Sequence, residues 1–129
     1  DYSAMAVVGD AIKFYETVLG GDLARRCNNE LVLKAGRYLS QVWETTLGTS
    51  EDMATTMVMV GLPTCLGWDW ESSEALKWRL FDEFRIVVQY PYPTEGQLWL
   101  RLSAGVYNYM EEFEILGKVI CDIVDELEA

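Results

Sequence analysis

The sequence predicts an α+β domain in which helices pack on a small, mostly antiparallel sheet. Hydrophobic residues recur at helical spacing in four segments. Between them lie shorter segments that are rich in β-branched residues or that alternate with a period of two. The predicted order is α-α-β-α-β-β-α, with the last two strands forming a hairpin. At 129 residues, half of them hydrophobic, the chain is long enough for a single domain with its own core.

The first two predicted helices are separated by a pair of glycines. Ser3 can cap a helix over residues 3–19, which Gly20 and Gly21 end. The hydrophobic face of this helix is wide, so it either contacts two bodies or is simply well buried. The second helix begins at Asp22 and runs to about Thr45. Its predicted buried stripe is Leu23, Cys27, Leu31, Ala35, Tyr38, Leu39 and Val42.

The middle of the chain predicts a strand, a loop, a helix and a second strand. Residues 53–62 are rich in β-branched and hydrophobic residues, which is typical of a strand buried on both faces. A loop with two tryptophans follows, and then a helix that Ser72 or Ser73 caps and that ends near Phe84. Residues 85–90 form a short strand. The residues that set the turn into the next strand are Pro91, Pro93 and Gly96.

Residues 97–103 show strict alternation, which indicates a half-buried strand. Its leucines, at positions 98, 100 and 102, face the core, so Trp99, Arg101 and Ser103 share the other face. A guanidinium binds a carboxylate through two parallel hydrogen bonds, and Arg101 is therefore a candidate anion receptor. The alternative is that Arg101 lies on a solvated face and pairs with one of the 21 acidic residues.

The last predicted helix runs from about Tyr109 to Leu127. Asn108 can cap it, and the first turn contains Glu111 and Glu112, which favour a helix start. Its hydrophobic stripe is Phe113, Leu116, Ile120, Ile123 and Leu127, with Val119 and Val124 broadening it.

Charge and cysteine content exclude several classes of function. A net charge of −11 without histidine repels phosphate backbones and anionic lipids, so we expect neither nucleic-acid nor membrane partners. No hydrophobic run is long enough to cross a bilayer, and a reduced, cytoplasmic setting fits best. Cys27, Cys65 and Cys121 lack metal-ligand spacing, and we expect no metal. Cys27 and Cys121 fall in helical patterns and are expected in the core.

The segment Arg-Leu-Ser-Ala-Gly-Val-Tyr-Asn, residues 101–108, followed by an acidic helix start, resembles the C-terminal signature of the class-V aminotransferase family of pyridoxal-phosphate enzymes. A short strand and a proline-containing loop before it resemble the isopenicillin N epimerase-like branch. Asp1-Tyr2-Ser3-Ala4, before a hydrophobic helix, resembles the family segment that leads from the large cofactor domain into the small C-terminal domain. The resemblance covers essentially all of residues 1–129. It implies the small domain of a fold-type-I enzyme, with residues 1–19 at the start of the interdomain helix region.

The resemblance also implies a role for the mid-strand arginine. In the family, the matching arginine binds the α-carboxylate of an amino-acid substrate, which assigns that role to Arg101. Trp99 and Ser103 would line the site or hold the guanidinium. The parent enzyme would act at the α-carbon as an epimerase, lyase or aminotransferase, usually as a homodimer. Pyridoxal phosphate would bind the missing large domain, and the isolated chain would be inactive without cofactor or catalytic residues of its own.

Two absences in the sequence accompany this resemblance. The lysines at positions 13, 34, 77 and 118 lie in helical segments with surface-type neighbours, which does not favour Schiff-base chemistry. Cysteine desulfurases of the family carry a nucleophilic cysteine in the loop before the arginine strand. Residues 89–96 contain none, and Cys65 lies on another loop without an evident base, so persulfide chemistry is disfavoured.

A second class of function stays open. The chain could be a free-standing acidic α+β interaction domain without catalysis, an interpretation favoured by its acidity and by four exposed-looking aromatic residues. The first residue is Asp1 and not methionine, which favours a fragment of a longer enzyme. The four aromatic residues are Trp68, Trp70, Tyr90 and Tyr92.

Overall fold

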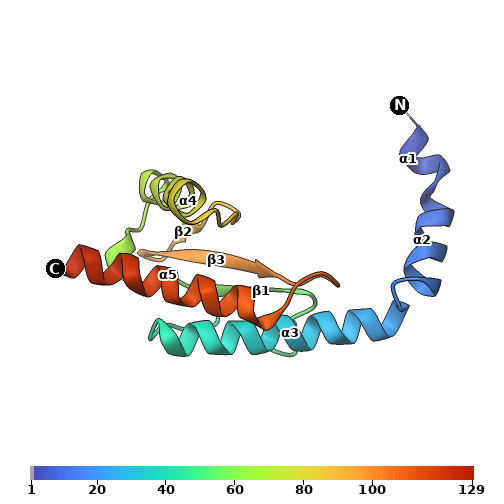
Figure 1. The fold of residues 1–129 in the computed structure, drawn as a ribbon, viewed down its shortest axis with the longest axis horizontal. Coiled ribbons are helices and arrows are strands. Elements are labelled where there is room, and N and C mark those ends of the chain that lie inside the picture. The colour runs from blue at the N-terminus through green and yellow to red at the C-terminus, as the bar shows by residue number, and fades with distance from the viewer. Residues whose placement is uncertain (1) are drawn as a thin grey trace.

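Three strands form one antiparallel sheet in the computed structural model, which describes residues 2–129 (Figure 1). The strands are β1 (Met57–Gly61), β2 (Tyr92–Thr94) and β3 (Gln97–Ser103), in the spatial order β1-β3-β2. The helices are α1 (Ser3–Ala6), α2 (Val8–Thr17), α3 (Gly21–Val42), the 3-10 turn η1 (Thr64–Leu66), α4 (Trp70–Phe84) and α5 (Met110–Glu128). The predicted α+β fold class is confirmed.

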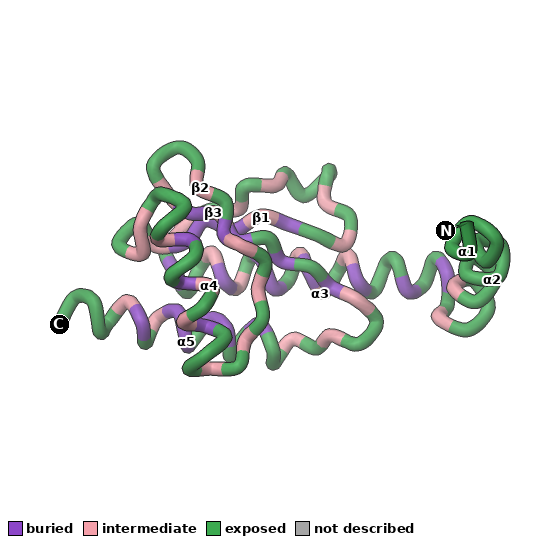
Figure 2. The backbone as a smooth tube through the Cα atoms, turned by 90° about the horizontal axis from the view of Figure 1, so that it is seen from above, coloured by how far each residue is buried: buried purple, intermediate pink, exposed green. Residues whose placement is uncertain are grey.

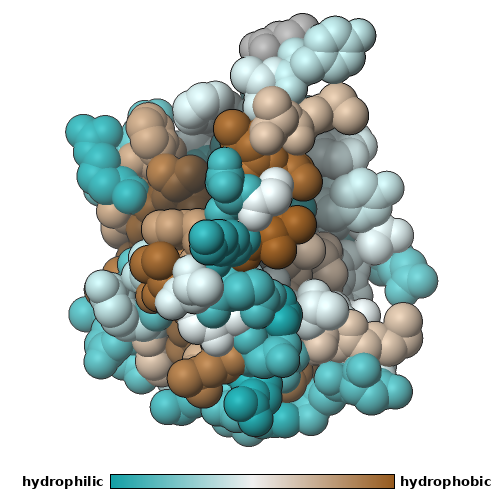
Figure 3. All heavy atoms as spheres, turned by 90° about the vertical axis from the view of Figure 1, so that its right-hand side faces the viewer, coloured by the Kyte–Doolittle hydropathy of each residue, from teal (hydrophilic) through white to brown (hydrophobic). Residues whose placement is uncertain are grey.

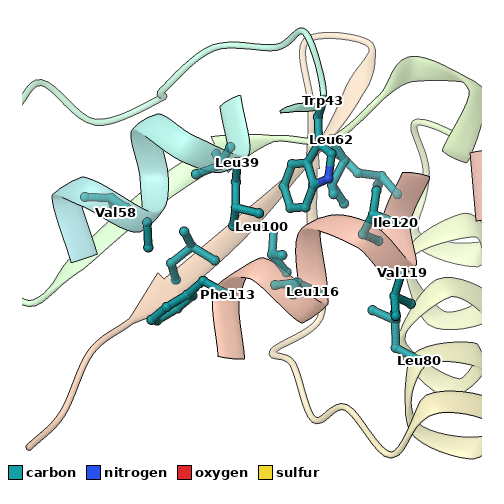
Figure 4. Close-up of a cluster of buried hydrophobic side chains, with 14 of the residues drawn as sticks. Leu39, Trp43, Val58, Leu62, Leu80, Leu100, Phe113, Leu116, Val119 and Ile120 are labelled. Carbon is teal, nitrogen blue, oxygen red and sulfur yellow. The ribbon is translucent and has the colours of Figure 1, made fainter. Parts of the chain in front are cut away.

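The core lies between one face of the sheet and helices α3 and α5. The predicted leucine face of β3 is buried, and the register places Val58 of β1 opposite Leu102 and Val60 opposite Leu100. Figure 4 shows Val58 and Leu100 near Leu39 of α3 and near residues of α5. Trp43, just after α3, donates a hydrogen bond from Nε1 to the carbonyl of Gly117 in α5 at 3.1 Å. This bond ties the two helices together beneath the sheet.

The predicted strand over residues 85–90 is wrong. These residues have no regular secondary structure and pair with no strand, and the strand before the hairpin is β2, which includes Pro93. Glu95 and Gly96 both have positive φ, as in the two-residue type I′ turn that fits the twist of a hairpin. Such a turn fixes Thr94 opposite Gln97. Pro93 is tolerated because its nitrogen faces away from β3, on the edge of the sheet.

The buried stripe of α3 differs in phase from the prediction. Leu23 and Cys27 are exposed, whereas Ala35 and Leu39 are buried as predicted. The first half of α3 extends beyond the sheet, so its larger hydrophobic residues have little to pack against (Figure 1). The helix also ends at Val42, because Glu44 takes a positive φ of 54°. The buried residues of α3 are Gly21, Ala24, Asn28, Val32, Ala35, Gly36 and Leu39.

Residues 3–17 form two short helices instead of one, with a break at Val7. Ser3 is the first helical residue and not the cap. No residue of α1 or α2 is buried, so the well-buried alternative is wrong for this chain. The two helices stand away from the sheet at the start of α3, as the burial colouring in Figure 2 shows. Figure 3 faces them and shows hydrophobic side chains at the surface, among them Val7, Val8, Ile12, Phe14 and Val18.

The start of α4 also differs from the prediction. Asp69, and neither Ser72 nor Ser73, is the cap: its Oδ1 accepts a hydrogen bond from the Ser72 backbone N–H at 2.8 Å. An aspartate satisfies an otherwise unpaired first-turn donor in this way. Ser73 is buried and donates instead to the carbonyl of Pro91 at 2.5 Å, which joins α4 to the segment before β2. Leu80 of α4 points toward Val119 of α5 (Figure 4).

Candidate functional site

The face of the sheet opposite the core carries the three predicted site residues. The register places Arg101 beside Met59, and Ser103 beside Met57. Trp99 lies between Gly61 of β1 and Tyr92 of β2. Arg101 and Ser103 are both exposed. This face is therefore open to a ligand or to a further part of a protein.

The side chain of Trp99 lies across β1 on this face. Residues 46–49 run beside the outer edge of β1, where Gly48 N–H donates to the Met59 carbonyl at 2.8 Å. The Trp99 ring reaches across β1 to Gly48, since a methyl group on Gly48 would lie 2.6 Å from the ring carbon Cζ3. Trp99 Nε1 is buried and has no hydrogen-bond partner within residues 2–129. The indole thus anchors this loop.

Arg101 makes no ion pair or side-chain hydrogen bond with any residue that the structure describes. Three other arginines are engaged: Arg25 with Asp22 and Glu16, Arg37 with Glu51, and Arg79 with Glu83 and Glu126. In a chain with so many carboxylates, an unpaired arginine in mid-strand is available to bind another anion. The alternative interpretation, that an acidic residue of the domain neutralises Arg101, is therefore not supported.

A groove of about 510 Å³ begins at this end of β3. Arg101, Leu102 and Ser103 form one side, and Asn108 with the first turns of α5 forms another. The segment that leaves α4, residues 85–89, closes the third side. Trp99 does not line the groove, so the structure brings Arg101, Ser103 and Asn108 together and places Trp99 apart from them.

The backbone of β3 faces this groove with unpaired groups. Leu62 N–H donates to the Leu98 carbonyl at 2.8 Å, and Ala104 N–H to the Thr56 carbonyl at 2.9 Å, so the even-numbered residues of β3 pair with β1. The odd-numbered residues face the other way because antiparallel bonding alternates. Since β2 begins at Tyr92, opposite Trp99, no described strand lies on that side to hydrogen-bond with the main chain of Arg101 or Ser103. These groups add hydrogen-bonding capacity to the groove.

Asn108 fixes the loop between β3 and α5. Its Oδ1 accepts from Gly105 N–H at 2.8 Å, and its Nδ2 donates to Glu112 at 2.9 Å. Glu112 also accepts from Tyr109 N–H at 3.0 Å, so Tyr109 and not Asn108 occupies the cap position. These hydrogen bonds from Asn108 and from the Tyr109 backbone lower the pKa of Glu112. The carboxylate that lines the groove is thus already held by two donors.

The sequence did not indicate that Arg85 and the segment after it, residues 85–89, would line the groove. Arg85 follows α4 and has a left-handed backbone, with φ of 60°. Its N–H donates to the Phe81 carbonyl at 3.1 Å, and Ile86 N–H donates to the Leu80 carbonyl at 3.0 Å. A glycine at this position would have signalled a helix end, whereas an arginine gives no such signal. The hairpin register was the available signal. A two-residue turn at residues 95–96 places residues 85–90 beside the C-terminal end of β3, and therefore near Arg101.

The cysteines lie outside this groove. Cys65 and Cys121 line a second groove of about 690 Å³ between η1 and the end of α5. Burial, with Glu128 nearby, raises the pKa of the Cys65 thiol, and burial with Asp125 and Asp122 nearby raises that of Cys121. Cys27 is exposed and Cys121 half-buried, so the prediction that Cys27 lies in the core is wrong. Among residues 2–129, no three metal-ligating side chains are grouped.

The lysines and loop aromatics are also apart from the groove. Lys77 Nζ lies 3.4 Å from the centre of the Tyr90 ring, a cation–π contact, and the other three lysines are exposed. Trp68, Trp70 and Tyr92 are exposed, and the Trp70 and Tyr92 rings meet edge to face with centroids 5.5 Å apart. No helix within residues 2–129 has the length and hydrophobicity needed to span a membrane.

Comparisons with known proteins give relatives for nearly the whole chain. The chain is 37% identical over 134 residues to a probable chloroplastic L-cysteine desulfhydrase of Arabidopsis thaliana, covering 96% of this chain and 28% of that protein. It is 32% identical to putative L-cysteine desulfhydrase 2 of Oryza sativa, covering 96% of this chain and 30% of that protein. The chain thus spans less than a third of the length of these relatives. No family model matches it.

A solved structure shares the fold. The 8-amino-7-oxononanoate synthase of Francisella tularensis aligns with 92% of this chain and 31% of its own, with a TM-score of 0.62 and 19% sequence identity. This likeness concerns the fold and not the chemistry. It agrees with the α+β arrangement expected for the small domain of a fold-type-I pyridoxal-phosphate enzyme.

Proposed function

We propose that this chain is the substrate-carboxylate-binding part of a longer pyridoxal-phosphate enzyme that acts at the α-carbon of an amino acid. The observation that carries the proposal is the unpaired state of Arg101 on an open sheet face beside a groove. The fork of the guanidinium would bind the α-carboxylate through two hydrogen bonds and so orient the bonds at the α-carbon. Ser103 and the unpaired main chain of β3 would supply further donors.

Among the reactions left open by the sequence, desulfhydrase chemistry on L-cysteine has the best support, because the matched relatives carry that name. It is a lyase reaction, one of the three classes that the resemblance implies. The epimerase and aminotransferase alternatives rest on the resemblance alone. The groove itself favours none of the three, since all of them require a bound α-carboxylate.

The cofactor would be held outside this chain. Lys77 is engaged with Tyr90 and the other lysines are exposed, so residues 2–129 do not fit the role of a Schiff-base site. Pyridoxal phosphate would supply the electron sink from the larger part of the protein. That part would cover the open sheet face and contact the exposed hydrophobic side chains of α1 and α2, and the whole protein would be a homodimer. The compartment is proposed as cytoplasmic, with a plastid as the alternative because one relative is chloroplastic.

A protein-interaction domain without catalysis is the second candidate. The exposed side chains of Trp68, Trp70 and Tyr92 favour it, since aromatic residues are enriched where proteins bind one another. That candidate has no use for an unpaired arginine in a groove and predicts no affinity for small carboxylates.

The carboxylate role can be tested on this chain by titration with propionate, followed by NMR of the backbone amides. The amides of Arg101 and Ser103 should shift, and Arg101→Gln should abolish the shift. The matched control is Arg26→Gln, which removes an unpaired arginine on α3, outside the groove. In the longer protein, Arg101→Lys should raise KM sharply and leave cofactor absorbance unchanged, because an ammonium cannot form the bidentate contact. An unchanged KM would end the carboxylate role.

A further inference from the structure

Two of the three arginines without an ion pair line the same groove. Of the six arginines, Arg25, Arg37 and Arg79 pair with carboxylates, and Arg26, Arg85 and Arg101 have no such partner within residues 2–129. Arg85 and Arg101 both line the groove, one just after α4 and the other on β3. With net charge −11 on the whole chain, this concentration of unpaired positive charge marks the groove as a local exception.

We propose that Arg85 is a second anion-binding position, which accepts a negatively charged side-chain group of the amino acid whose α-carboxylate binds Arg101. The inference rests on the carboxylate role proposed for Arg101 and departs from free L-cysteine, whose thiol is neutral at pH 7. The substrate class is amino acids with an acidic side chain, including cysteine derivatives that carry an acidic substituent. The chemical requirement is a second negative charge a few bonds from the first.

The groove combines charged and hydrophobic lining. Its volume of about 510 Å³ lies in the range of small-molecule sites. Besides the two arginines, its lining includes the hydrophobic side chains of Ile86, Phe113 and Leu116. Both arginines are exposed, so a charge pair formed with either contributes about as much as an exposed ion pair.

The third charged residue of the groove, Glu112, does not neutralise Arg85 or Arg101. Glu112 is the acidic residue among the lining side chains, and its carboxylate already accepts hydrogen bonds from Asn108 and from the Tyr109 backbone. Because those two donors hold it at the start of α5, both guanidinium groups stay available. The lining keeps a net positive charge of one.

The backbone of Arg85 decides which substitution tests the proposal. Its φ of 60° is left-handed, a conformation in which a helix ends with glycine or sometimes asparagine. Glu44, just past α3, has a similar φ of 54°, so the conformation itself does not point to a ligand. Glycine at this position would therefore remove the guanidinium and relieve the backbone at the same time. The substitution Arg85→Gly separates binding from folding.

The test compares three probes on this chain at pH 7 and low salt, with affinities from the NMR shifts of the Arg101 and Ser103 amides. Succinate carries two charges, propionate carries one, and 3-mercaptopropionate carries one charge with a neutral thiol. Succinate should bind up to about fivefold more tightly than the other two, since one added exposed ion pair contributes up to about that factor. Arg85→Gly and Arg85→Asn should abolish the difference between succinate and propionate, whereas Arg26→Gln should leave that difference in place.

The outcomes separate this inference from the proposed function. Equal affinities for succinate and propionate in the unsubstituted chain, or a preference for succinate that survives Arg85→Gly, overturn the second position and leave Arg101 as the carboxylate receptor. If the unsubstituted chain binds none of the three probes, the proposed function is overturned as well. Tight binding of 3-mercaptopropionate shows that shape and not charge is recognised, which also overturns the inference. Urea unfolding of Arg85→Gly should give a midpoint equal to or above that of the unsubstituted chain, which confirms folding.

Discussion

The indole of Trp99 lies so close to Gly48 that a methyl group at position 48 would be 2.6 Å from its ring carbon Cζ3 and 2.8 Å from Cε3. Glycine is therefore required here by the space that the ring occupies. Gly48→Ala should displace either the ring or residues 46–49, at a cost of about 1–3 kcal/mol in the free energy of unfolding. Urea denaturation followed by tryptophan fluorescence measures this cost.

The matched control for Gly48→Ala is Gly9→Ala. Gly9 lies within α2, and nothing comes within 4 Å of an added methyl group. This substitution should favour the helix by about 0.5–1 kcal/mol locally without moving the unfolding midpoint of the core. Equal effects of the two substitutions would show that the ring does not confine Gly48.

The bond between Trp43 and Gly117 should be necessary for stability. Trp43 is buried, and Trp43→Phe leaves the Gly117 carbonyl without its donor. The expected loss is about 1–3 kcal/mol, the cost of an unsatisfied buried polar group. Trp68→Phe, at a position 66% exposed, should change stability by less than about 0.5 kcal/mol. Thermal unfolding of both variants checks the contrast, and a Trp43→Phe protein as stable as Trp68→Phe would contradict it.

The Glu112 carboxylate should make stability depend on pH. Hydrogen bonds from Asn108 and the Tyr109 backbone depress its pKa in the folded state below the ordinary 4.5. A depressed carboxyl pKa contributes stability above the unfolded-state pKa, and the contribution is lost as pH falls through the folded-state value. Glu112→Gln removes the charge and keeps an oxygen that can accept. The unsubstituted chain should thus be more stable than Glu112→Gln at pH 7, with the gap closing as the pH falls below about 4.5.

Urea midpoints of both proteins across this range measure the effect. If the stability difference between the two proteins is constant from pH 7 to pH 3, the shape of the Glu112 side chain and not its charge stabilises the fold.

The three cysteines should differ in their reaction with iodoacetamide. The thiolate is the reactive form, and burial together with acidic neighbours raises the pKa of Cys65 and Cys121. Cys27 is exposed on α3. At pH 8, Cys27 should be alkylated first and Cys121, which is half-buried, last. Peptide mass spectrometry over a time course gives the order, and faster labelling of Cys121 than of Cys27 would contradict it.

Sequence patterning identified the elements whose burial is one-sided. β3 was predicted to the residue because Leu98, Leu100 and Leu102 alternate with polar neighbours, and the structure buries those three. The stripe of α5 was correct at Phe113, Leu116, Ile120 and Ile123, whereas Leu127 is exposed. Leu127 lies beyond the end of the sheet, and the period of a helix does not reveal where its packing partner stops.

The candidate site was predictable in part. Alternation placed Arg101 and Ser103 on one face, and the structure adds that Arg101 is unpaired beside a groove. The wall from Arg85 was not predictable from local preference, because Ile86 and Val88 resemble strand residues. The turn at Glu95 and Gly96 sets the register of β2, and the pairing stops at Tyr92 although that register would let it continue. The carboxylate role of Arg101 stays a prediction.

The two-helix arm of residues 3–17 has a consequence for how this chain melts. Because none of its side chains is buried, its amides can open to solvent while the sheet and α5 stay intact. Deuterium uptake there should finish long before exchange begins at Leu39 or Ile120. A denaturation curve measured by total helicity would then combine the unfolding of residues 3–17 with the unfolding of the core. Fluorescence of the buried Trp43 would report the unfolding of the core.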